Sequence, residues 1–291
     1  MPARHHPTSH ETASVTWLRP GRAGFAVLCA VLAGDAIVVA LCALHRETPL
    51  IWPTLALVMT LAWVAAGVIW ARLGVFARPI VAFAGPQPWL ALTFDDGPHP
   101  VETPAILGIL AERGHQATFF VIGTKAAAHP ALVRTIVAAG HTVANHTLYH
   151  APWTALLPAG PLARQIVAAS TQIVQAGAPP TRWMRAPVGL ISPPVARAAQ
   201  IGRVELVHWT VTARDGVADV SALRCLQRLK RGVRPGAILV LHDGVVSPSP
   251  VDGPRSVARQ VLPALLDELD RHGLVSVSLD QLAAAAAASA P

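Results

Sequence analysis

The stretch WLALTFDDGP, residues Trp89–Pro98, joins a short apolar run to two adjacent carboxylates and a Gly-Pro break. A short apolar run bounded by turn-forming residues is typical of a buried strand. Asp95 and Asp96 then lie at the carboxyl end of that strand. In a parallel α/β domain this end carries the chemistry, because the carboxyl ends of the strands meet at one edge. The pair predicts a functional site, with a simple Asp-Asp-Gly-Pro turn as the alternative.

Strand-like and helix-like segments alternate after this stretch. The further strand candidates are ATFFVIG, HTVANH, RWMRAP, VELVHWT, AILVLHD and VSVSL, with helical patterns between them. Seven such units predict an α/β domain over residues 88–282, with parallel strands inside and helices outside. The pattern alone fits both an open doubly wound sheet and a closed barrel. No Gly-rich dinucleotide fingerprint and no phosphate loop follow any candidate strand.

Unusual polar residues fall at the carboxyl ends of these candidates. After Asp95 and Asp96 they are His146, His150, Arg185, Asp215, His242 and Asp243. The histidines of NHTLYH are four residues apart, and on a helical turn that spacing puts two imidazoles on one face. With one carboxylate from the first strand they make a three-ligand metal set with a place left for water, as catalytic metal sites have. The second carboxylate can then accept the proton of the attacking water.

Five motifs, in this order, give the domain a family resemblance. They are TFDDGP (93–98), NHTLYH (145–150), RAPVG (185–189), WTVTARD (209–215) and LVLHDG (239–244). The domain resembles the polysaccharide deacetylases of the NodB-homology group, carbohydrate esterase family four. The resemblance implies a distorted (β/α) barrel with seven strands. It also implies a hydrolase of carbon–nitrogen bonds other than peptide bonds.

The resemblance implies a metal site and an acid–base pair. Asp96, His146 and His150 would bind a divalent metal, usually Zn²⁺, with Co²⁺, Ni²⁺ and Mn²⁺ as alternatives. Asp95 would be the general base that activates water. His242 would be the general acid that protonates the leaving amine.

The remaining motif residues would position these groups or contact the substrate. Arg185 would hold Asp95 in place, and Asp215 would orient His242. Val188, through a nearby backbone N–H, would stabilise the oxyanion, and Leu241 is expected at the substrate or oxyanion as well. The chain departs from the family pattern at Ala186 and Val188, where proline and an aromatic residue are common, and at Gly216, where tryptophan is common. These departures leave the sugar and the acyl group open.

Two apolar stretches, residues 24–44 and 50–70, precede the domain. Each is long enough for a transmembrane helix, which needs about 20 apolar residues. They predict a membrane hairpin, with a disordered tail over 1–23, a linker over 71–87 and a low-complexity tail over 283–291. Asp35 is costly within a span, so it either faces the second helix or makes the first span insert poorly. A signal peptide is the competing interpretation of the first stretch.

Flanking arginines predict the orientation of the hairpin. Arg4, Arg19 and Arg22 precede it, Arg72 and Arg78 follow it, and Arg46 lies between the spans. The positive-inside rule puts the two-pass chain in the cell membrane with its catalytic domain in the cytoplasm; if only the second helix spans, the domain is extracytoplasmic. The net charge of +7 comes from scattered residues, so it favours an anionic membrane surface over nucleic acid.

The sequence thus predicts a membrane-anchored, metal-dependent N-deacetylase of an acetamido sugar. The expected partners are the lipid bilayer and an N-acylated glycan or lipid-linked sugar, and no nucleic acid. One alternative is a deformylase of a lipid-linked amino sugar at the cytoplasmic face. Another is a non-catalytic glycan-binding protein on the same fold, although the chain keeps the base, the acid and all three metal ligands.

Overall fold

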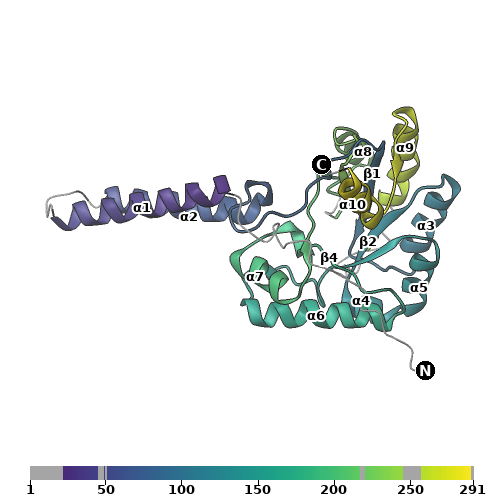
Figure 1. Cartoon of the computed structure of the whole chain (residues 1–291), viewed down its shortest axis with the longest axis horizontal. Helices are drawn as coiled ribbons and strands as arrows, with labels where there is room; N and C mark the ends of the chain where they lie inside the picture. The colour runs from purple at the N-terminus through teal and green to yellow at the C-terminus, as the bar shows by residue number, and fades with distance from the viewer. Residues whose placement is uncertain (1–21, 45–48, 50, 217–219, 245–256, 290–291) are drawn as a thin grey trace, which may run out of the picture.

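The computed structural model describes residues 22–44, 49, 51–216, 220–244 and 257–289. The expected N-terminal tail therefore lies almost wholly outside the described residues, as does most of the connection between the two apolar stretches. Figure 1 shows two long helices that extend from an α/β domain.

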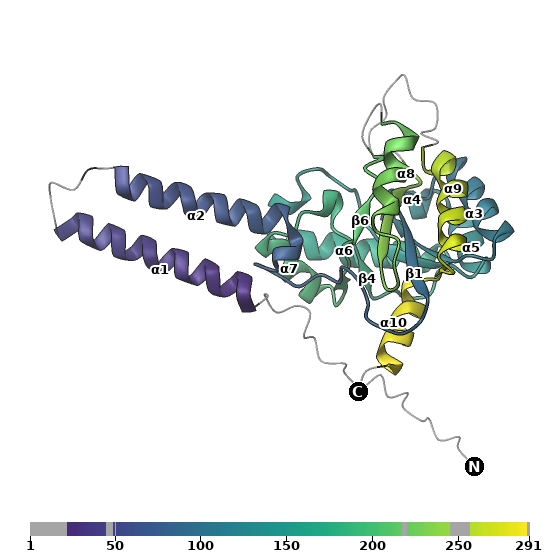
Figure 2. The same cartoon turned by 90° about the horizontal axis from the view of Figure 1, so that it is seen from above.

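The two apolar stretches form helices α1 (Arg22–Leu44) and α2 (Ile51–Ile69), which lie side by side (Figures 1 and 2). Both are long and apolar enough to cross a membrane. Most of their large apolar side chains are exposed, because the α/β domain does not cover them. The Thr60 hydroxyl of α2 donates a hydrogen bond to the Asp35 carboxylate of α1. Asp35 therefore faces the second helix, the first of the two expectations for it.

A parallel sheet forms the centre of the domain, with strand order β5-β4-β3-β2-β1-β7-β6 and with β8 paired to β1. The strands are β1 (Trp89–Asp95), β2 (Ala117–Val121), β3 (Thr142–Asn145), β4 (Trp183–Met184), β5 (Glu205–Leu206), β6 (Val211–Thr212), β7 (Ile238–His242) and β8 (Val275–Ser276). Strand β1 pairs with both β2 and β7, which sets Asp95 opposite His242. The expected barrel-like (β/α) fold is confirmed.

The predicted single strand VELVHWT was wrong, because the chain leaves one edge of the sheet there and joins the other. Strand β5 ends at Leu206 and pairs with β4, whereas β6 begins at Val211 and pairs with β7. Between them the His208 amide donates to the Ile80 carbonyl at 2.7 Å. Since only residues 207–210 join the two edge strands, the sheet must curl until its edges approach each other. Asp215 accordingly follows β6, not β5.

Helices cover the outside of this curled sheet (Figure 1). They are α3 (Glu102–Glu112), α4 (Gly123–Ala128), α5 (Pro130–Ala138), α6 (Ala159–Gln175), α7 (Pro193–Ile201), α8 (Ala222–Lys230), α9 (Val257–Arg271) and α10 (Leu279–Ala288), with short 3₁₀ turns η2 (Ala71–Leu73), η3 (Thr154–Leu156) and η4 (Pro187–Gly189). Alternate residues of β1 point to opposite faces. Leu90, Leu92 and Phe94 enter the core shared with α3 and α9. Thr93 and Asp95 therefore face the inside of the curl.

The expected low-complexity tail 283–291 is instead mostly helical, with α10 running to Ala288. Alanine is the strongest helix former, and Ser278 with Gln281 forms a capping box at the start of the helix. Leu282 and Ala283 are buried in a cluster that includes Trp183. The repeated alanines thus build an element of the domain, and only residues 290–291 lie outside the description.

Leu282→Ala is expected to lower the free energy of unfolding by about 2–5 kcal/mol, because it removes a buried side chain and leaves a cavity. Leu223→Ala on α8 is the matched control, since Leu223 is 63% exposed, and it is expected to change stability by less than about 0.5 kcal/mol. Urea unfolding of the full chain in detergent measures both. Equal effects of the two changes would show that α10 does not pack as described.

Candidate active site

The ends of β1 and β3 bring together Asp96, His146 and His150. The Asp96 Oδ1 atom lies 3.3 Å from the Nε2 atom of each histidine. All three residues are buried, and their ligand atoms lie within 4.8 Å of one another. The strand-end rule, by which polar residues at the carboxyl ends of parallel strands lie close together, therefore correctly predicted that these three side chains cluster.

The predicted helical turn between the two histidines was wrong, because they lie on a loop. Thr147 and His150 have φ of 64° and 52°, values outside the range of a right-handed α-helix. The Asn145 side chain accepts a hydrogen bond from the Thr147 amide at 2.8 Å, and the Thr147 hydroxyl accepts from the His150 amide at 3.2 Å. These local bonds bring the two imidazole rings to 4.6 Å between centroids.

The donor atoms fit a divalent cation. The His146 Nδ1 lies 2.9 Å from the Arg185 carbonyl oxygen, so Nδ1 donates to that carbonyl and Nε2 faces Asp96. Burial and His146 lower the pKa of His150 to about 4, which keeps this imidazole neutral at pH 7. Burial would raise the pKa of Asp96, but the neighbouring histidines lower it to about 2. Two imidazole nitrogens and a carboxylate oxygen that face one another are a donor set that a divalent cation could bind.

A second observation agrees with this fit. Asp96 Oδ1 is buried and accepts no hydrogen bond from the residues that the structure describes. Buried carboxylate oxygens are almost always paired, and a metal ion would pair this one. Two imidazoles and one carboxylate suit Zn²⁺ and neighbouring divalent metals alike, so the donor set does not select among them.

Asp95 is held by a buried arginine. The Arg185 Nη1 donates to Asp95 Oδ1 at 2.6 Å and to the Thr93 hydroxyl at 2.9 Å, and Nη2 donates to the His208 carbonyl at 3.0 Å. The guanidinium carbon lies 4.0 Å from the centre of the Phe120 ring. Burial lowers the pKa of Arg185, and the charge of Asp95 opposes that shift. The predicted pairing of Arg185 with Asp95 is therefore present in the geometry.

His242 is held by Asp215 in a similar way. One Asp215 oxygen lies 2.7 Å from His242 Nδ1, and the other accepts from the His242 amide at 2.9 Å. Burial opposes protonation, but the charge and hydrogen bond of Asp215, together with the charges of Asp96 and Asp95, raise the pKa of His242 to about 9. The imidazole is consequently protonated at pH 7, with Nε2 free of Asp215.

The two residues expected at the substrate or oxyanion occupy different environments. Val188 is 58% exposed and has φ of 50°, a conformation that is strained for a β-branched residue. Leu241 is fully buried in the core shared with α3 and α9 and offers no exposed side-chain surface to a ligand. Contact of either residue with a substrate stays a prediction.

Sequence reasoning missed Lys125 and Thr103, and it placed Asp243 at a strand end without a catalytic role. The Lys125 ammonium donates to the Asp96 carbonyl at 2.7 Å. The Thr103 hydroxyl donates to the fully buried Asp243 carboxylate at 2.5 Å. Burial raises the pKa of Asp243 to about 7, although the hydrogen bond from Thr103 and the charge of Lys125 act to lower it. The strand-end rule applied to β2 would have found Lys125, because it is the first charged residue after that strand.

Known proteins share this domain. Residues 84–204 match the family described as polysaccharide deacetylase. A chitooligosaccharide deacetylase from Sinorhizobium fredii is 38% identical over 67% of this chain and 91% of its own length. A peptidoglycan-N-acetylglucosamine deacetylase from Bacillus cereus is 28% identical over 66% of this chain and 87% of its own. A family 4 carbohydrate esterase from Streptomyces lividans, solved with acetate, superimposes with a TM-score of 0.56 at 29% identity, covering 67% and 93%.

Asp215→Asn is expected to lower the pKa of His242 by about one unit or more, because an adjacent negative charge stabilises the protonated ring. Histidine NMR titration of the metal-free full chain measures this pKa directly. Asp267→Asn is the control, since Asp267 lies on the exposed surface of α9 and should leave His242 near its wild-type value. An unchanged titration in Asp215→Asn would contradict the assignment.

Proposed function

Because this chain belongs to the polysaccharide deacetylase family and is a hydrolase of carbon–nitrogen bonds other than peptide bonds, we propose that it removes the N-acetyl group from N-acetylglucosamine units of a glycan, using the residues of the described site. The observation that carries the proposal is that a cluster able to bind a metal lies at the same edge of the sheet as a carboxylate and an imidazole, each fixed by a hydrogen-bonded partner. Asp95 is fixed by Arg185, and His242 by Asp215.

The reaction splits the amide with water. A divalent metal at Asp96, His146 and His150 would polarise the amide carbonyl and acidify water. Asp95 takes the proton of the attacking water, and the hydrogen bond from Arg185 orients the carboxylate. His242 then gives its proton to the leaving amine nitrogen as the C–N bond breaks. A backbone N–H near Val188 donates to the oxygen that carries negative charge in the transition state.

The substrate class follows from the relatives. The Sinorhizobium and Bacillus proteins are named for chitooligosaccharides and for peptidoglycan N-acetylglucosamine, both of which carry the same acetamido group. Ala186 and Val188 are smaller than the residues common at these places in the family. A smaller wall would alter which acyl group or sugar fits, so formyl release from a lipid-linked amino sugar is the variant reaction to compare.

Acyl release tests this function. The full chain, freed of metal and reloaded with Zn²⁺, Co²⁺, Ni²⁺ or Mn²⁺, is offered chitooligosaccharides, peptidoglycan and a lipid-linked N-formyl amino sugar. Acetate and formate are measured. Asp95→Asn is expected to keep its metal, because the asparagine oxygen can still accept the hydrogen bond from Arg185. It is expected to lose about 10²–10⁴-fold in rate, because the amide cannot act as the base. Asp96→Asn is expected to lose both metal and activity.

Asp267→Asn is the matched carboxylate control and should behave as wild type. Metal bound at full occupancy with no acyl release from any substrate would overturn the enzymatic function in favour of glycan binding. Asp95→Asn with undiminished activity would instead remove this residue from the mechanism.

We also propose that α1 and α2 anchor the enzyme in the cell membrane with its catalytic domain in the cytoplasm. The support is the length of the two helices, the Asp35–Thr60 hydrogen bond between them, and the arginines outside the hairpin. A fluorescent protein that folds only in the cytoplasm, fused after Pro291, should fluoresce. Deleting residues 24–44 leaves one span and should abolish the signal. The reverse pattern would place the domain outside.

A further inference from the structure

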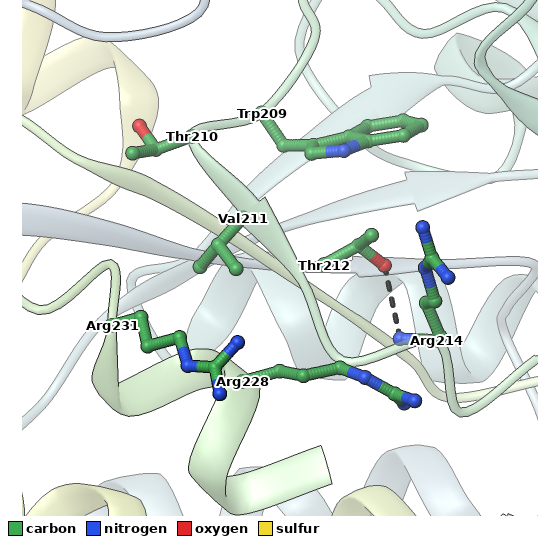
Figure 3. A pocket seen from close by; sticks show the side chains of 7 residues that line it. All are labelled: Trp209, Thr210, Val211, Thr212, Arg214, Arg228 and Arg231. Carbon is green, nitrogen blue, oxygen red and sulfur yellow. Dashed lines mark hydrogen bonds between the residues drawn. The ribbon is translucent and has the colours of Figure 1, made fainter. Parts of the chain in front are cut away.

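A pocket beside the active site is lined by three arginines. It has a volume of about 380 Å³ and is formed by residues 209–212 with Arg214, Arg228 and Arg231. That volume is within the range of roughly 300–1,000 Å³ found for small-molecule sites. Figure 3 shows Arg228 of α8 and Arg231, which directly follows α8, below β6. Arg214 extends from the loop after β6 towards the Trp209 ring.

Among the described residues, the three arginines of this pocket have no acidic partner. No carboxylate is among the lining residues. Within the described part of the chain, none of the three guanidiniums forms an ion pair; Arg228 donates only to the Ala213 carbonyl, at 3.2 Å. Arginine keeps its charge throughout the physiological pH range. Within the residues that the structure describes, the pocket is therefore a concave surface whose three arginines form no ion pair.

The helix dipole accounts for part of this arrangement only. Arg228 lies in the last turn of α8 and Arg231 directly follows that helix, where a cation is stabilised by the carbonyl end of the helix. Arg214 comes from another element and has φ of 58°, so its backbone is held in a strained conformation. The dipole gives no reason for Arg214 to join the other two.

Residues of this pocket are linked both to the loop that carries Asp215 and to the turn that follows α2. Arg214 directly precedes Asp215, which holds His242. On the other side Arg72, from the turn that follows α2, donates to the Trp209 carbonyl at 2.9 Å and to the Thr210 carbonyl. The wall of the pocket is thus tied to the end of the second apolar helix.

We propose that the pocket binds a phosphoryl group, and that in the cell this group belongs to a lipid of the membrane that holds α1 and α2. Guanidinium groups pair bidentately with phosphate oxygens. A carboxylate has two oxygens and one charge, which a single arginine satisfies, whereas a phosphate or pyrophosphate offers enough oxygens and charge for three. The group is either the phosphate of a lipid-linked sugar substrate or the headgroup of an anionic phospholipid. The first role rests on the proposed deacylase function; phosphoryl binding itself does not.

Binding of inorganic pyrophosphate tests the chemistry. Calorimetric titration uses the full chain in detergent at low and high salt. Arg228→Gln/Arg231→Gln is expected to weaken binding at least tenfold, because it removes two guanidinium groups from the pocket. Arg214→Gln removes one and is expected to weaken binding several-fold. The control Arg224→Gln/Arg234→Gln makes the same change in net charge at exposed arginines outside the pocket and should stay within twofold of wild type.

Equal weakening in the pocket and control variants would show a diffuse charge effect and overturn the site. Glucuronate, a carboxylate probe, is expected to bind at least tenfold more weakly than pyrophosphate. Equal binding of the two would overturn the phosphoryl assignment. Arg214→Gln gives an independent answer if the double variant fails to fold.

Lipid capture tests the source of the group. The full chain is reconstituted in phosphatidylcholine vesicles that contain phosphatidic acid and a polyprenyl monophosphate, and retained lipid is identified by native mass spectrometry. Retention of phosphatidic acid or of the polyprenyl monophosphate by wild type and by the control variant, but not by the pocket variant, supports the proposal. Preference for the polyprenyl phosphate indicates the substrate role, and preference for phosphatidic acid indicates the headgroup role.

Binding of pyrophosphate with no lipid retained would overturn the membrane-lipid part. Acyl release and pocket binding are measured separately, so each can fail alone. An inactive protein that still binds pyrophosphate would refute the deacylase function and leave the pocket standing.

Discussion

The buried guanidinium of Arg185 is the constraint on which the site depends. It is 1% exposed and lies inside the curled sheet, where a lone charge would be very costly. Its partners are Asp95 and Thr93 on β1 and the His208 carbonyl on the crossover between the two edge strands. The same group thus holds the Asp95 carboxylate and ties the curled edge of the sheet to its centre. Loss of Arg185 would leave Asp95 as an unpaired buried charge, so catalysis and folding cannot be separated at this position.

The register of β1 against β7 explains why the other half of the site falls into place. Because Asp95 is opposite His242, the two residues that follow them, Asp96 and Asp243, are brought together. Gly97 and Gly244 make that approach possible. A Cβ atom at Gly97 would lie 2.4 Å from Asp243 Oδ2, and one at Gly244 would lie 2.2 Å from the Asp96 carbonyl oxygen. The glycines of TFDDGP and LVLHDG are therefore packing requirements of two touching turns.

Sequence reasoning placed Asp95, Asp96, His146, His150 and His242 together because one rule governs their positions. Parallel strands end at a common edge, and strand ends can be read from short apolar runs. It failed where a contact remote in sequence decides the structure. The break between β5 and β6 depends on the Ile80 carbonyl, and α10 depends on a surface formed by Trp183. The loop of His146 and His150 is set by side-chain hydrogen bonds that residue spacing cannot show.

The distinction between local sequence properties and contacts remote in sequence also applies to the junction between the hairpin and the domain. The length of each apolar stretch is a local property, so the sequence could predict two helices. Their attachment is not local: the Ile191 amide donates to the Val68 carbonyl in the last turn of α2, and Gly67 packs against Val75. Ile191 is three residues beyond Val188. Val188 belongs to the RAPVG motif, which is expected to contact the oxyanion. For a chain anchored by these helices, α2 therefore ends against the loop that would contact the acyl group. Such an anchor would fix the orientation of the site relative to the bilayer, and a flexible linker over 71–87 would not.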